Sequence, residues 1–376
     1  MNYSHQLPEG IETVPSPSLC IDKDLVLSNL AKLLEMVNGN ASLLRPHIKT
    51  HKCGEILKLQ RELGINQIKC ATIAEAEIAA LAGIADVLIS YPVVGPHVAR
   101  FFQLKEAYPK TTFAALVDSE AGLCGFAKEA DARETAATLF LDLDCGMHRT
   151  GIAPGEKALA LVQAIETQPL LNWGGIHAYD GHIHQPEVEE RRKAFDLAIA
   201  EVDNFIETLV SHGIDVPLVV SGGSPTFAMH IEVASQSSRP WQCSPGTPLL
   251  WDSGYGTNHP DLDFSPAAFL LTRVVSQPCN GQICVDLGTK AISAENLIHN
   301  RVRFPGIPDA TFVGQSEEHL VISVDDPSAY PVGAEFVAIP YHVCPSVALY
   351  EEAYLIENGK LSEERWTISR GRRITI

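Results

Sequence analysis

The segment "LRPHIKTHK" gathers basic and titratable side chains in a chain that is otherwise acidic, with a formal net charge of −18. The group consists of Arg45, His47, Lys49, His51 and Lys52. A lysine beside other cations, and partly removed from water, has a lowered pKa and can act as a neutral amine nucleophile. Lys49 is the candidate, and its product with a carbonyl compound is a Schiff base. The alternative is that Lys49 and Lys52 begin a solvated helix.

A second pair of reactive side chains lies in "PYHVCPSVALYEEAYLI". His342 and Cys344 are two residues apart, so in a strand they project to the same face and can bind one ion. An imidazole with a thiolate favours Zn²⁺ over Mg²⁺. Two ligands leave coordination positions for water or substrate, as in a catalytic zinc site. The alternative is a core cysteine near an unrelated histidine.

Two glycine-containing turns, "SGGSPT" and "PGT", are candidate phosphate-binding loops. Glycine lets backbone N–H groups converge on an anion, and serine or threonine hydroxyls add donors. The residues assigned to a phosphate are Gly223, Ser224, Thr226, Gly246 and Thr247.

A histidine-rich stretch, "IHAYDGHIHQ", contains His177, Tyr179, His182 and His184. His182 and His184 are candidates for a catalytic base. Two alternatives stay open: the histidines are ordinary polar loop residues, or "GHIH" is the H-x-H zinc pair of barrel hydrolases. The latter usually needs further histidine and aspartate ligands on other strands, and a full set is not evident in the sequence.

The elements that must position these residues alternate between short apolar runs and helical stretches from about residue 40 to 250. This alternation is typical of βα units on a parallel sheet. The predicted strands are "SLLRPHIK", "QIKCAT", "DVLISY", "TFAALVD", "TLFLDLD", "WGGIHAY", "PLVVSGG" and "WQCSPGT". Eight strands predict a (β/α)8 barrel of the TIM type, in an α/β domain over residues 20–260. The lysine segment and the glycine turns then fall at strand C-terminal ends, where barrels place their chemistry.

After residue 261 the sequence predicts a mostly β domain extending to residue 376, with residues 1–19 possibly added to it. The predicted strands lie in "AAFLLTRVVSQP", "GQICVDLG", "HLVISVDD", "AEFVAIPYHVC" and "EEAYLIENGKL". Turn residues separate them, and comparable helical runs are missing. The N-terminal "PSPSLCID" is a candidate to pair with these strands.

Composition restricts the partners of the protein. The acidic balance of the 376-residue chain argues against nucleic acid and against an anionic membrane surface, so we expect a small-molecule substrate or another protein as partner. The sequence has neither a signal-like N-terminus nor an apolar run long enough to span a membrane, which predicts a soluble cytoplasmic protein. Nine scattered cysteines predict reduced and mostly inert thiols.

Taken together, "RPHIKTHK", "LDCGMHRTG" and "HVCPSVALYEEAYLI…W…SRGR" resemble the D-serine dehydratase and D-threonine aldolase family, metal-dependent pyridoxal-phosphate enzymes of the alanine racemase fold. The resemblance covers nearly the whole chain. It implies that Lys49 carries the cofactor, that Arg149 bonds its phenolic oxygen, and that Tyr179 lies against its pyridine ring. It also implies that His342 and Cys344 bind zinc beside the cofactor.

The resemblance further implies a lyase acting on D-3-hydroxy amino acids. Cys344 favours the dehydratase branch, with D-serine or 3-hydroxyaspartate as substrate, because the aldolase branch is expected to have an aspartate at this position. The nearest alternative is retro-aldol cleavage to glycine and an aldehyde. An amino-acid racemase and a non-catalytic pyridoxal-phosphate carrier are further alternatives, and the extra β domain argues against the carrier. The fold type implies a homodimer in which each β domain completes the partner's site.

Overall fold

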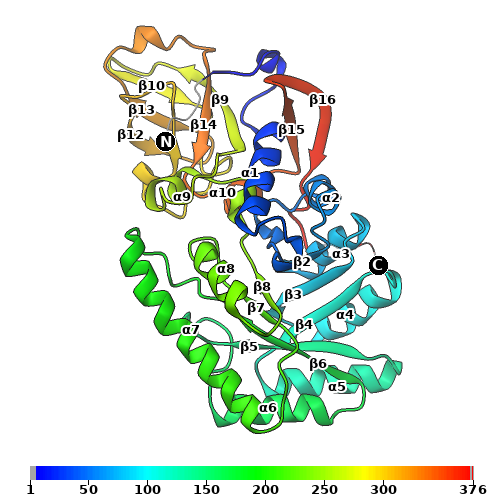
Figure 1. Cartoon of the computed structure of the whole chain (residues 1–376). Helices are drawn as coiled ribbons and strands as arrows, with labels where there is room; N and C mark the ends of the chain where they lie inside the picture. The colour runs from blue at the N-terminus through cyan, green and yellow to red at the C-terminus, as the bar shows by residue number, and fades with distance from the viewer. Residues whose placement is uncertain (1–5, 373–374, 376) are drawn as a thin grey trace. The chain divides into compact units, whose positions relative to one another are not determined.

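The computed structural model describes residues 6–372 and 375, and the chain divides into two compact units (Figure 1). Unit 1 is formed by Met1–Leu33, Thr50–Glu55 and Thr247–Arg370. Unit 2 is formed by Leu34–Lys49, Ile56–Gly246 and Gly371–Ile376. The chain thus passes from unit 2 to unit 1 between two consecutive residues, Lys49 and Thr50. The assignment of cofactor binding to residues 20–260 and of metal binding to residues 261–376 stays a prediction.

Unit 2 contains a sheet of seven parallel strands in sequential order from β2 to β8. Their bounds are β2 (Gln67–Cys70), β3 (Asp86–Pro92), β4 (Thr112–Val117), β5 (Ala137–Leu143), β6 (Leu171–Ala178), β7 (Val219–Ser221) and β8 (Trp241–Cys243). Consecutive residues such as Val87, Leu88 and Ile89 are all buried, as expected of parallel strands covered on both faces. The predicted α/β fold class is confirmed.

The segment predicted as the first barrel strand is not a regular strand. Leu44 forms an isolated parallel bridge with Cys243 of β8, and His47 forms one with Lys69 of β2. The segment therefore connects the two edge strands of the sheet and occupies the first strand's place. Pro46 lacks the N–H that a continuous ladder needs, which accounts for the interruption. Two short 3₁₀ helices, η2 (Ala41–Leu43) and η3 (Ile48–Thr50), flank it, and Lys49 lies in η3 rather than at a strand end.

Helices follow the strands of unit 2, and Figure 1 shows α4 to α8 along the outer side of the curled sheet. The bounds are α2 (Gly54–Glu62, its first two residues in unit 1), α3 (Ile73–Leu81), α4 (Pro96–Ala107), α5 (Glu120–Arg133), α6 (Glu156–Thr167), α7 (Val188–Ser211) and α8 (Phe227–Gln236). The helix after the lysine segment begins at Gly54, later than predicted, because Lys52 has a left-handed φ of 47°. No described helix has both the length and the apolar character needed to cross a membrane.

Unit 1 is built around a nine-stranded sheet in the order β12-β13-β10-β9-β1-β15-β16, with β14 pairing with β9 and with β11. The bounds are β1 (Ser18–Asp22), β9 (Ala268–Ser276), β10 (Gln282–Val285), β11 (Val302–Arg303), β12 (Thr311–Gln315), β13 (Leu320–Ser323), β14 (Glu335–Pro340), β15 (Glu352–Glu357) and β16 (Lys360–Thr367). The predicted mostly β domain is confirmed. β1 lies between β9 and β15, so "PSPSLCID" does pair with this sheet.

Short helices and an apolar cluster complete unit 1. The helices are α1 (Lys23–Met36, its last three residues in unit 2), α9 (Ser253–Asn258), α10 (Val343–Val347), η1 (Ile11–Thr13), η4 (Thr247–Leu249), η5 (Ile298–Asn300) and η6 (Pro327–Ala329). The cluster includes Ile11, Phe269, Leu271, Val337 and Ile356. All nine cysteines are free thiols, as predicted, and Cys344 is among the few that are not buried.

Candidate active site

Three cationic side chains of unit 2 converge on one aromatic ring, that of Tyr179. The Nζ atoms of Lys49 and Lys69 lie 5.7 Å and 5.4 Å from the ring centroid, and the Arg149 guanidinium carbon lies 5.1 Å from it. Lys49 comes from η3, Lys69 from β2, Arg149 from the loop after β5, and Tyr179 from the end of β6. The structure therefore brings together the three predicted residues Lys49, Arg149 and Tyr179, and adds Lys69.

The loop that carries Arg149 is held by hydrogen bonds from its backbone N–H groups to the Asp144 side chain. Asp144 Oδ1 accepts N–H donations from Gly146 and His148, each at 3.0 Å. Gly151 has a φ of +97°, and a Cβ atom there would lie 2.9 Å from the backbone nitrogen of Asp144. Glycine is therefore required where the loop returns to the end of β5, and this return sets the position of Arg149.

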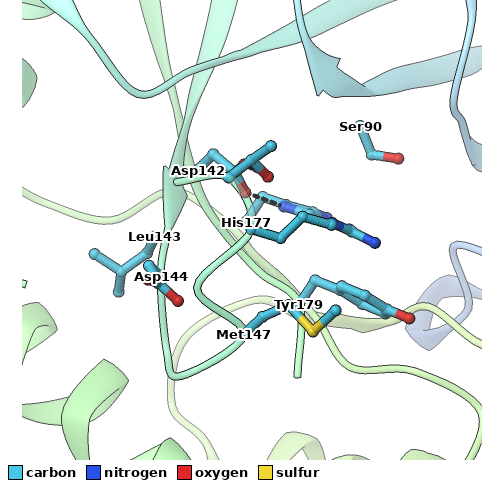
Figure 2. Close-up of a pocket in the computed structure, with 9 residues that line it drawn as sticks. Ser90, Asp142, Leu143, Asp144, Met147, His177 and Tyr179 are labelled. Carbon is cyan, nitrogen blue, oxygen red and sulfur yellow. Dashed lines mark hydrogen bonds and ion pairs between the residues drawn. The ribbon is translucent and has the colours of Figure 1, made fainter. Parts of the chain in front are cut away.

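A buried polar chain extends from Lys69 along β6 and β5. Lys69 Nζ lies 3.3 Å from His177 Nε2, and His177 Nδ1 lies 2.8 Å from Asp142 Oδ1. Thr150 Oγ1 donates to the other Asp142 oxygen at 2.9 Å. Figure 2 shows Asp142, His177 and Tyr179 along the wall of one pocket, which Arg149 and Thr150 also line. Sequence reasoning missed Lys69 and Asp142, although a charged residue inside an apolar strand such as "QIKC" is a usable signal.

The charges in this polar chain follow from burial and proximity. Burial, followed by the nearby Lys49 cation, lowers the pKa of Lys69 to about 7. Burial and the Lys69 charge also lower the pKa of His177. Burial alone would raise the pKa of Asp142, but its hydrogen bond with His177 and the charge there hold this pKa below its ordinary value. At neutral pH the chain thus holds a carboxylate, a neutral imidazole and an amine close to its titration point.

The charge balance around Tyr179 fits an anionic aromatic ligand. In the described part of the chain, the salt bridges at this site use His177 and His148 and do not include Lys49, Lys69 or Arg149. Cations that are partly removed from water need an opposite charge nearby. Pyridoxal phosphate has a phenolate and a phosphate, and its aldehyde can react with a lysine amine. These residues therefore fit that cofactor.

The first glycine turn folds tightly after β7. Gly222 has a φ of +87°, and a Cβ atom there would lie 2.3 Å from the His230 ring. The Gly223 N–H donates to Thr226 Oγ1 at 3.4 Å, and the Gly246 N–H donates to Ser224 Oγ at 3.3 Å. The structure thus brings together four of the five residues predicted to bind phosphate.

Two further hydroxyls lie in the second turn or next to it in the sequence. Ser244 Oγ is buried and has no hydrogen-bond partner among the described residues. Thr247, the fifth residue predicted to bind phosphate, is buried and begins η4 in unit 1. The phosphate role of both turns stays a prediction.

A buried hydrogen-bonded pair, Asp180 and His230, supports the first turn. Asp180 follows Tyr179, and its Oδ2 lies 2.9 Å from His230 Nε2 of α8. Asp180 also hydrogen-bonds Thr226, which connects β6 to the turn. Aspartate and histidine are therefore structural partners of Tyr179 and the turn, and sequence reasoning did not identify them.

The two histidines predicted as bases have different environments. His182 packs against the Arg149 loop, where a Cβ atom at Gly146 would lie 2.8 Å from its Nε2 atom. Its Nδ1 atom is buried and has no hydrogen-bond partner in the described residues. His184 is exposed. The catalytic role of either histidine stays a prediction, and His182 is the one with an unsatisfied ring nitrogen.

The metal pair lies in unit 1, but its local structure differs from the prediction. His342 is the N-cap of α10 and Cys344 lies in the first turn of this short helix, so the same-face argument for a strand does not apply. β14 ends at Pro340, so His342 and Cys344 lie beyond the end of the strand. The two side chains nevertheless hydrogen-bond each other. Thr50 Oγ1 lies 3.2 Å from Cys344 Sγ.

His342 also contacts a carboxylate. Its Nδ1 atom bonds Glu295 Oε1, which leaves Nε2 as the ligand atom for a metal. Burial lowers the pKa of His342, but the hydrogen bond and charge of Cys344, followed by those of Glu295, outweigh it and raise the pKa to about 9.

The start of α9 holds the metal segment in place. Ser253 Oγ donates to the Pro340 carbonyl at 3.0 Å, and Asp252 Oδ2 accepts from the Val343 N–H at 3.0 Å. The Gly254 N–H donates to the Tyr341 carbonyl at 3.0 Å. A Cβ atom at Gly254 would lie 2.3 Å from that carbonyl oxygen, so this approach requires glycine.

The donor set fits a metal that keeps open positions. Among the described residues, no group of three or more histidine, cysteine, aspartate or glutamate side chains is arranged to hold a metal ion. His342 and Cys344 offer one imidazole and one thiolate, which is a borderline-soft pair suited to Zn²⁺. Water or substrate would complete the coordination.

The chain matches two family models, one in its N-terminal part and one in its C-terminal part. The family described as "Alanine racemase, N-terminal domain" matches residues 21–240, and a serine dehydratase domain matches residues 267–356. The chain is 29% identical to the D-threonine aldolase of Arthrobacter sp. over 96% of this chain and 94% of the relative. It is 23% identical to the D-threo-3-hydroxyaspartate dehydratase of Delftia sp. over 92% and 94% of the two chains.

A solved structure, the D-threonine aldolase from Filomicrobium marinum, superposes with a TM-score of 0.87 at 25% identity and covers 99% of both chains. Aldolases and dehydratases are both lyases, and all three of these proteins align over nearly the full length of the chain. The chain belongs to the alanine racemase N-terminal domain family, and the proteins to which it is similar over nearly its full length include a D-threonine aldolase and a D-serine dehydratase.

Proposed function

We propose that the protein is a pyridoxal-phosphate- and metal-dependent lyase that acts on D-3-hydroxy amino acids. The convergence of Lys49 and Arg149 on the ring of Tyr179 supports the cofactor assignment. The family relationship supports it independently, because aldolases and dehydratases of D-hydroxy amino acids align over nearly the whole chain.

Each residue near Tyr179 has a distinct role in this proposal. Lys49 binds the cofactor covalently and, once released by the substrate amine, removes the substrate's α-proton. Arg149 stays protonated and donates to the phenolic oxygen, while the phenol of Tyr179 lies against the pyridine ring. Bound pyridoxal phosphate supplies the electron sink that acidifies the α-proton. The phosphate is assigned to Gly223, Ser224, Thr226, Gly246 and Thr247.

The metal is assigned to His342 and Cys344. A Zn²⁺ ion there supplies a Lewis acid for the β-hydroxyl of the substrate. Thr50, which contacts Cys344, is the residue that follows Lys49 in the chain. This sequence neighbourhood supports the assignment of the lysine and the metal to one reaction.

We assign the reaction to dehydration, with D-serine or 3-hydroxyaspartate as substrate and a 2-oxo acid and ammonia as products. Cys344 carries this choice, because a thiolate ligand is the feature expected of the dehydratase branch. Retro-aldol cleavage is the second candidate, and the higher identity to a D-threonine aldolase than to a dehydratase favours it. In that reaction a base removes the hydroxyl proton, and His182 or His184 would serve.

We also propose that the protein acts in the cytoplasm as a homodimer, as the fold type implies. Sedimentation at several protein concentrations tests the dimer directly. A monomer at every concentration would remove the dimer from the proposal and leave the residue assignments unchanged.

One incubation series tests the reaction. Purified protein with cofactor and Zn²⁺ is given D-serine, D-threonine, D-threo-3-hydroxyaspartate or L-serine, and 2-oxo acid, glycine and aldehyde are assayed together. We expect oxo acid and ammonia from D-serine or the hydroxyaspartate and nothing measurable from L-serine. Glycine and acetaldehyde from D-threonine, with no oxo acid from any substrate, would replace dehydration by the aldolase reaction. No product from any substrate would refute the lyase.

A further inference from the structure

Lys69 is a buried amine that the proposed function does not yet use. Its side chain is only 2% exposed, and its Nζ atom lies 5.4 Å from the centroid of the Tyr179 ring. It hydrogen-bonds His177, although a protonated lysine carries three donors. A buried ammonium with so few partners is costly. Selection for stability alone would favour an apolar residue at this position of β2.

In the hydrogen bonds that connect Lys69, His177 and Asp142, the donor and the acceptor of each pair can be assigned. Asp142 is ionised, so it only accepts hydrogen bonds, and the His177 Nδ1 atom must carry the proton between them. The second Asp142 oxygen accepts from Thr150. His177 Nε2 therefore has a lone pair, which accepts from Lys69. Asp142 and His177 thus fix the position of the Lys69 amine. They do not use its other N–H bonds or, in the neutral form, its lone pair.

Charged groups from several elements face Lys69 and oppose one another. Lys49 and Arg149 disfavour its protonated form, and burial has the largest effect in the same direction. Asp180 and Asp142 favour the protonated form. The balance brings the pKa of Lys69 to about 7, so both protonation states are accessible near neutral pH. A group with this property is suited to general acid–base catalysis.

We propose that Lys69 is a second acid–base group of the site, which accepts the proton that the ammonium group of a D-amino acid must lose before its nitrogen can react. This inference rests on the proposed function. The step is a simple transfer: one N–H bond of the substrate breaks, one N–H bond forms on Lys69, and the positive charge moves with the proton. No oxidant or additional reactant is needed.

The neighbouring groups are poor candidates for the same step. Lys49 is assigned to the covalent bond with the cofactor, so its amine is already engaged when the substrate arrives. Arginine does not act as a base in proteins, so Arg149 is not a candidate. The free lone pair of His177 is already used by Lys69. Lys69 is the group at the ring of Tyr179 that has an accessible neutral state and no other assigned role.

The first test measures Lys69 itself, without cofactor or turnover. NMR of protein containing ¹³C-labelled lysine, titrated from pH 6 to 10 in the cofactor-free state, should show one lysine that titrates near neutral pH. This signal should disappear in Lys69→Met and remain in Lys110→Met, a control at an exposed position of the same unit. A wild-type spectrum in which every lysine titrates above pH 9 would refute the proposal.

The second test separates a base from a fixed cation. D-Alanine has no β-hydroxyl, so loaded protein can neither dehydrate nor cleave it. The change in visible absorption when its amine reacts gives the rate. Lys69→Met and Lys69→Arg should both slow this change at pH 7.5 by about 100-fold or more, the size expected when a general base is lost. Wild-type rates in Lys69→Arg would show that Lys69 acts only as a cation and would overturn the proposal.

The design also separates this inference from the proposed function. If the wild-type protein shows no spectral response to any D-amino acid, the lyase assignment itself fails. If the wild type responds and the two Lys69 variants respond at the same rate, only the role of Lys69 fails. Lys110→Met should match the wild type in both measurements.

Discussion

The cofactor region and the metal region are built in opposite ways. Around Tyr179, the functional side chains come from η3, β2, the loop after β5 and the end of β6, which are far apart in sequence. The metal pair lies within three consecutive residues, with His342 as the N-cap of the five-residue helix α10 and Cys344 in its first turn. Lys69 is almost completely buried, whereas the His342 side chain is 38% exposed. One region depends on the topology of a sheet and the other on a local turn.

Because of this difference, we expect substitutions to have different effects in the two regions. In the cofactor region Lys69, His177 and Asp142 are buried and interact electrostatically, so a single substitution changes the pKa values of several neighbours. The position of the metal pair depends on a few hydrogen bonds from the start of α9. A substitution there should therefore affect only the metal site. The two regions should therefore respond independently to substitution, and the following predictions test that independence.

The largest effect is expected for Lys49→Ala, which should abolish the visible absorption of bound cofactor and leave the metal content unchanged. The amine is the proposed point of covalent attachment, so no other side chain should replace it. Borohydride reduction followed by peptide mapping locates the attachment, with Lys52→Ala as a control from the same segment. A label on Lys52, or on no lysine, would refute the assignment.

A loss nearly as complete is expected for His342→Ala and Cys344→Ala, which should each reduce bound metal to near zero because only two protein ligands are assigned. The cofactor absorption should remain. Elemental analysis measures the metal, and Cys279→Ala provides a control at an exposed cysteine. Full metal occupancy in both variants would place the metal elsewhere, with the "GHIH" segment as the next candidate.

Lys69→Met should make the cofactor-free protein more stable at pH 7, by up to about 4 kcal/mol. The unfolded chain keeps the Lys69 proton up to its ordinary pKa of 10.5, whereas the folded protein keeps it only up to about 7. The unfolded state therefore binds more protons between these values, and the stability of the wild type rises with pH across this window. The advantage of the methionine variant should shrink from pH 7 to pH 10.

Urea unfolding at several pH values measures this change, and Lys110→Met should behave as the wild type. A methionine variant that is less stable than the wild type at pH 7 would mean that the His177 hydrogen bond outweighs the cost of the buried amine.

A smaller effect is expected for Gly254→Ala, whose new methyl group would collide with the Tyr341 carbonyl and shift the metal segment. Metal affinity should fall by about 10-fold, which is typical for loss of a supporting interaction around a metal site. Cofactor affinity should not change. Gly314→Ala is a suitable control, since a Cβ atom there would meet no atom within 4 Å. Equal metal affinities in the two variants would show that α9 does not hold the pair.

Sequence reasoning succeeded where a residue's neighbours in the chain determine its environment. The apolar runs predicted β2 to β8, and the turn-rich segment after residue 261 predicted the second sheet. It failed at "SLLRPHIK", where Pro46 interrupts the ladder, and at His342, where the strand had already ended. Both errors concern single residues that redirect the backbone, and an apolar pattern does not register them.

The predicted Lys49, Arg149 and Tyr179 do meet, whereas Lys69 and Asp142 were missed. The first three were predicted from the resemblance to a known family, and Lys49 also from the cations around it in the sequence. The missed pair lies inside strands, where one charged residue among apolar neighbours is easily taken for a strand-end residue. Identifying Lys69 requires knowing that β2 and β6 face the same interior, which is long-range information that one sequence contains only indirectly.

The central strand β1 is synthesised long before the two strands that pair with it. The two partners of β1, β9 and β15, are made about 250 and 330 residues after it. At ordinary elongation rates this delay is on the order of tens of seconds. Unit 2 can fold in the interval, while β1 waits with both edges unpaired. The nascent chain therefore has a period of exposure to aggregation that the finished protein, with β1 in the centre of its sheet, does not reveal.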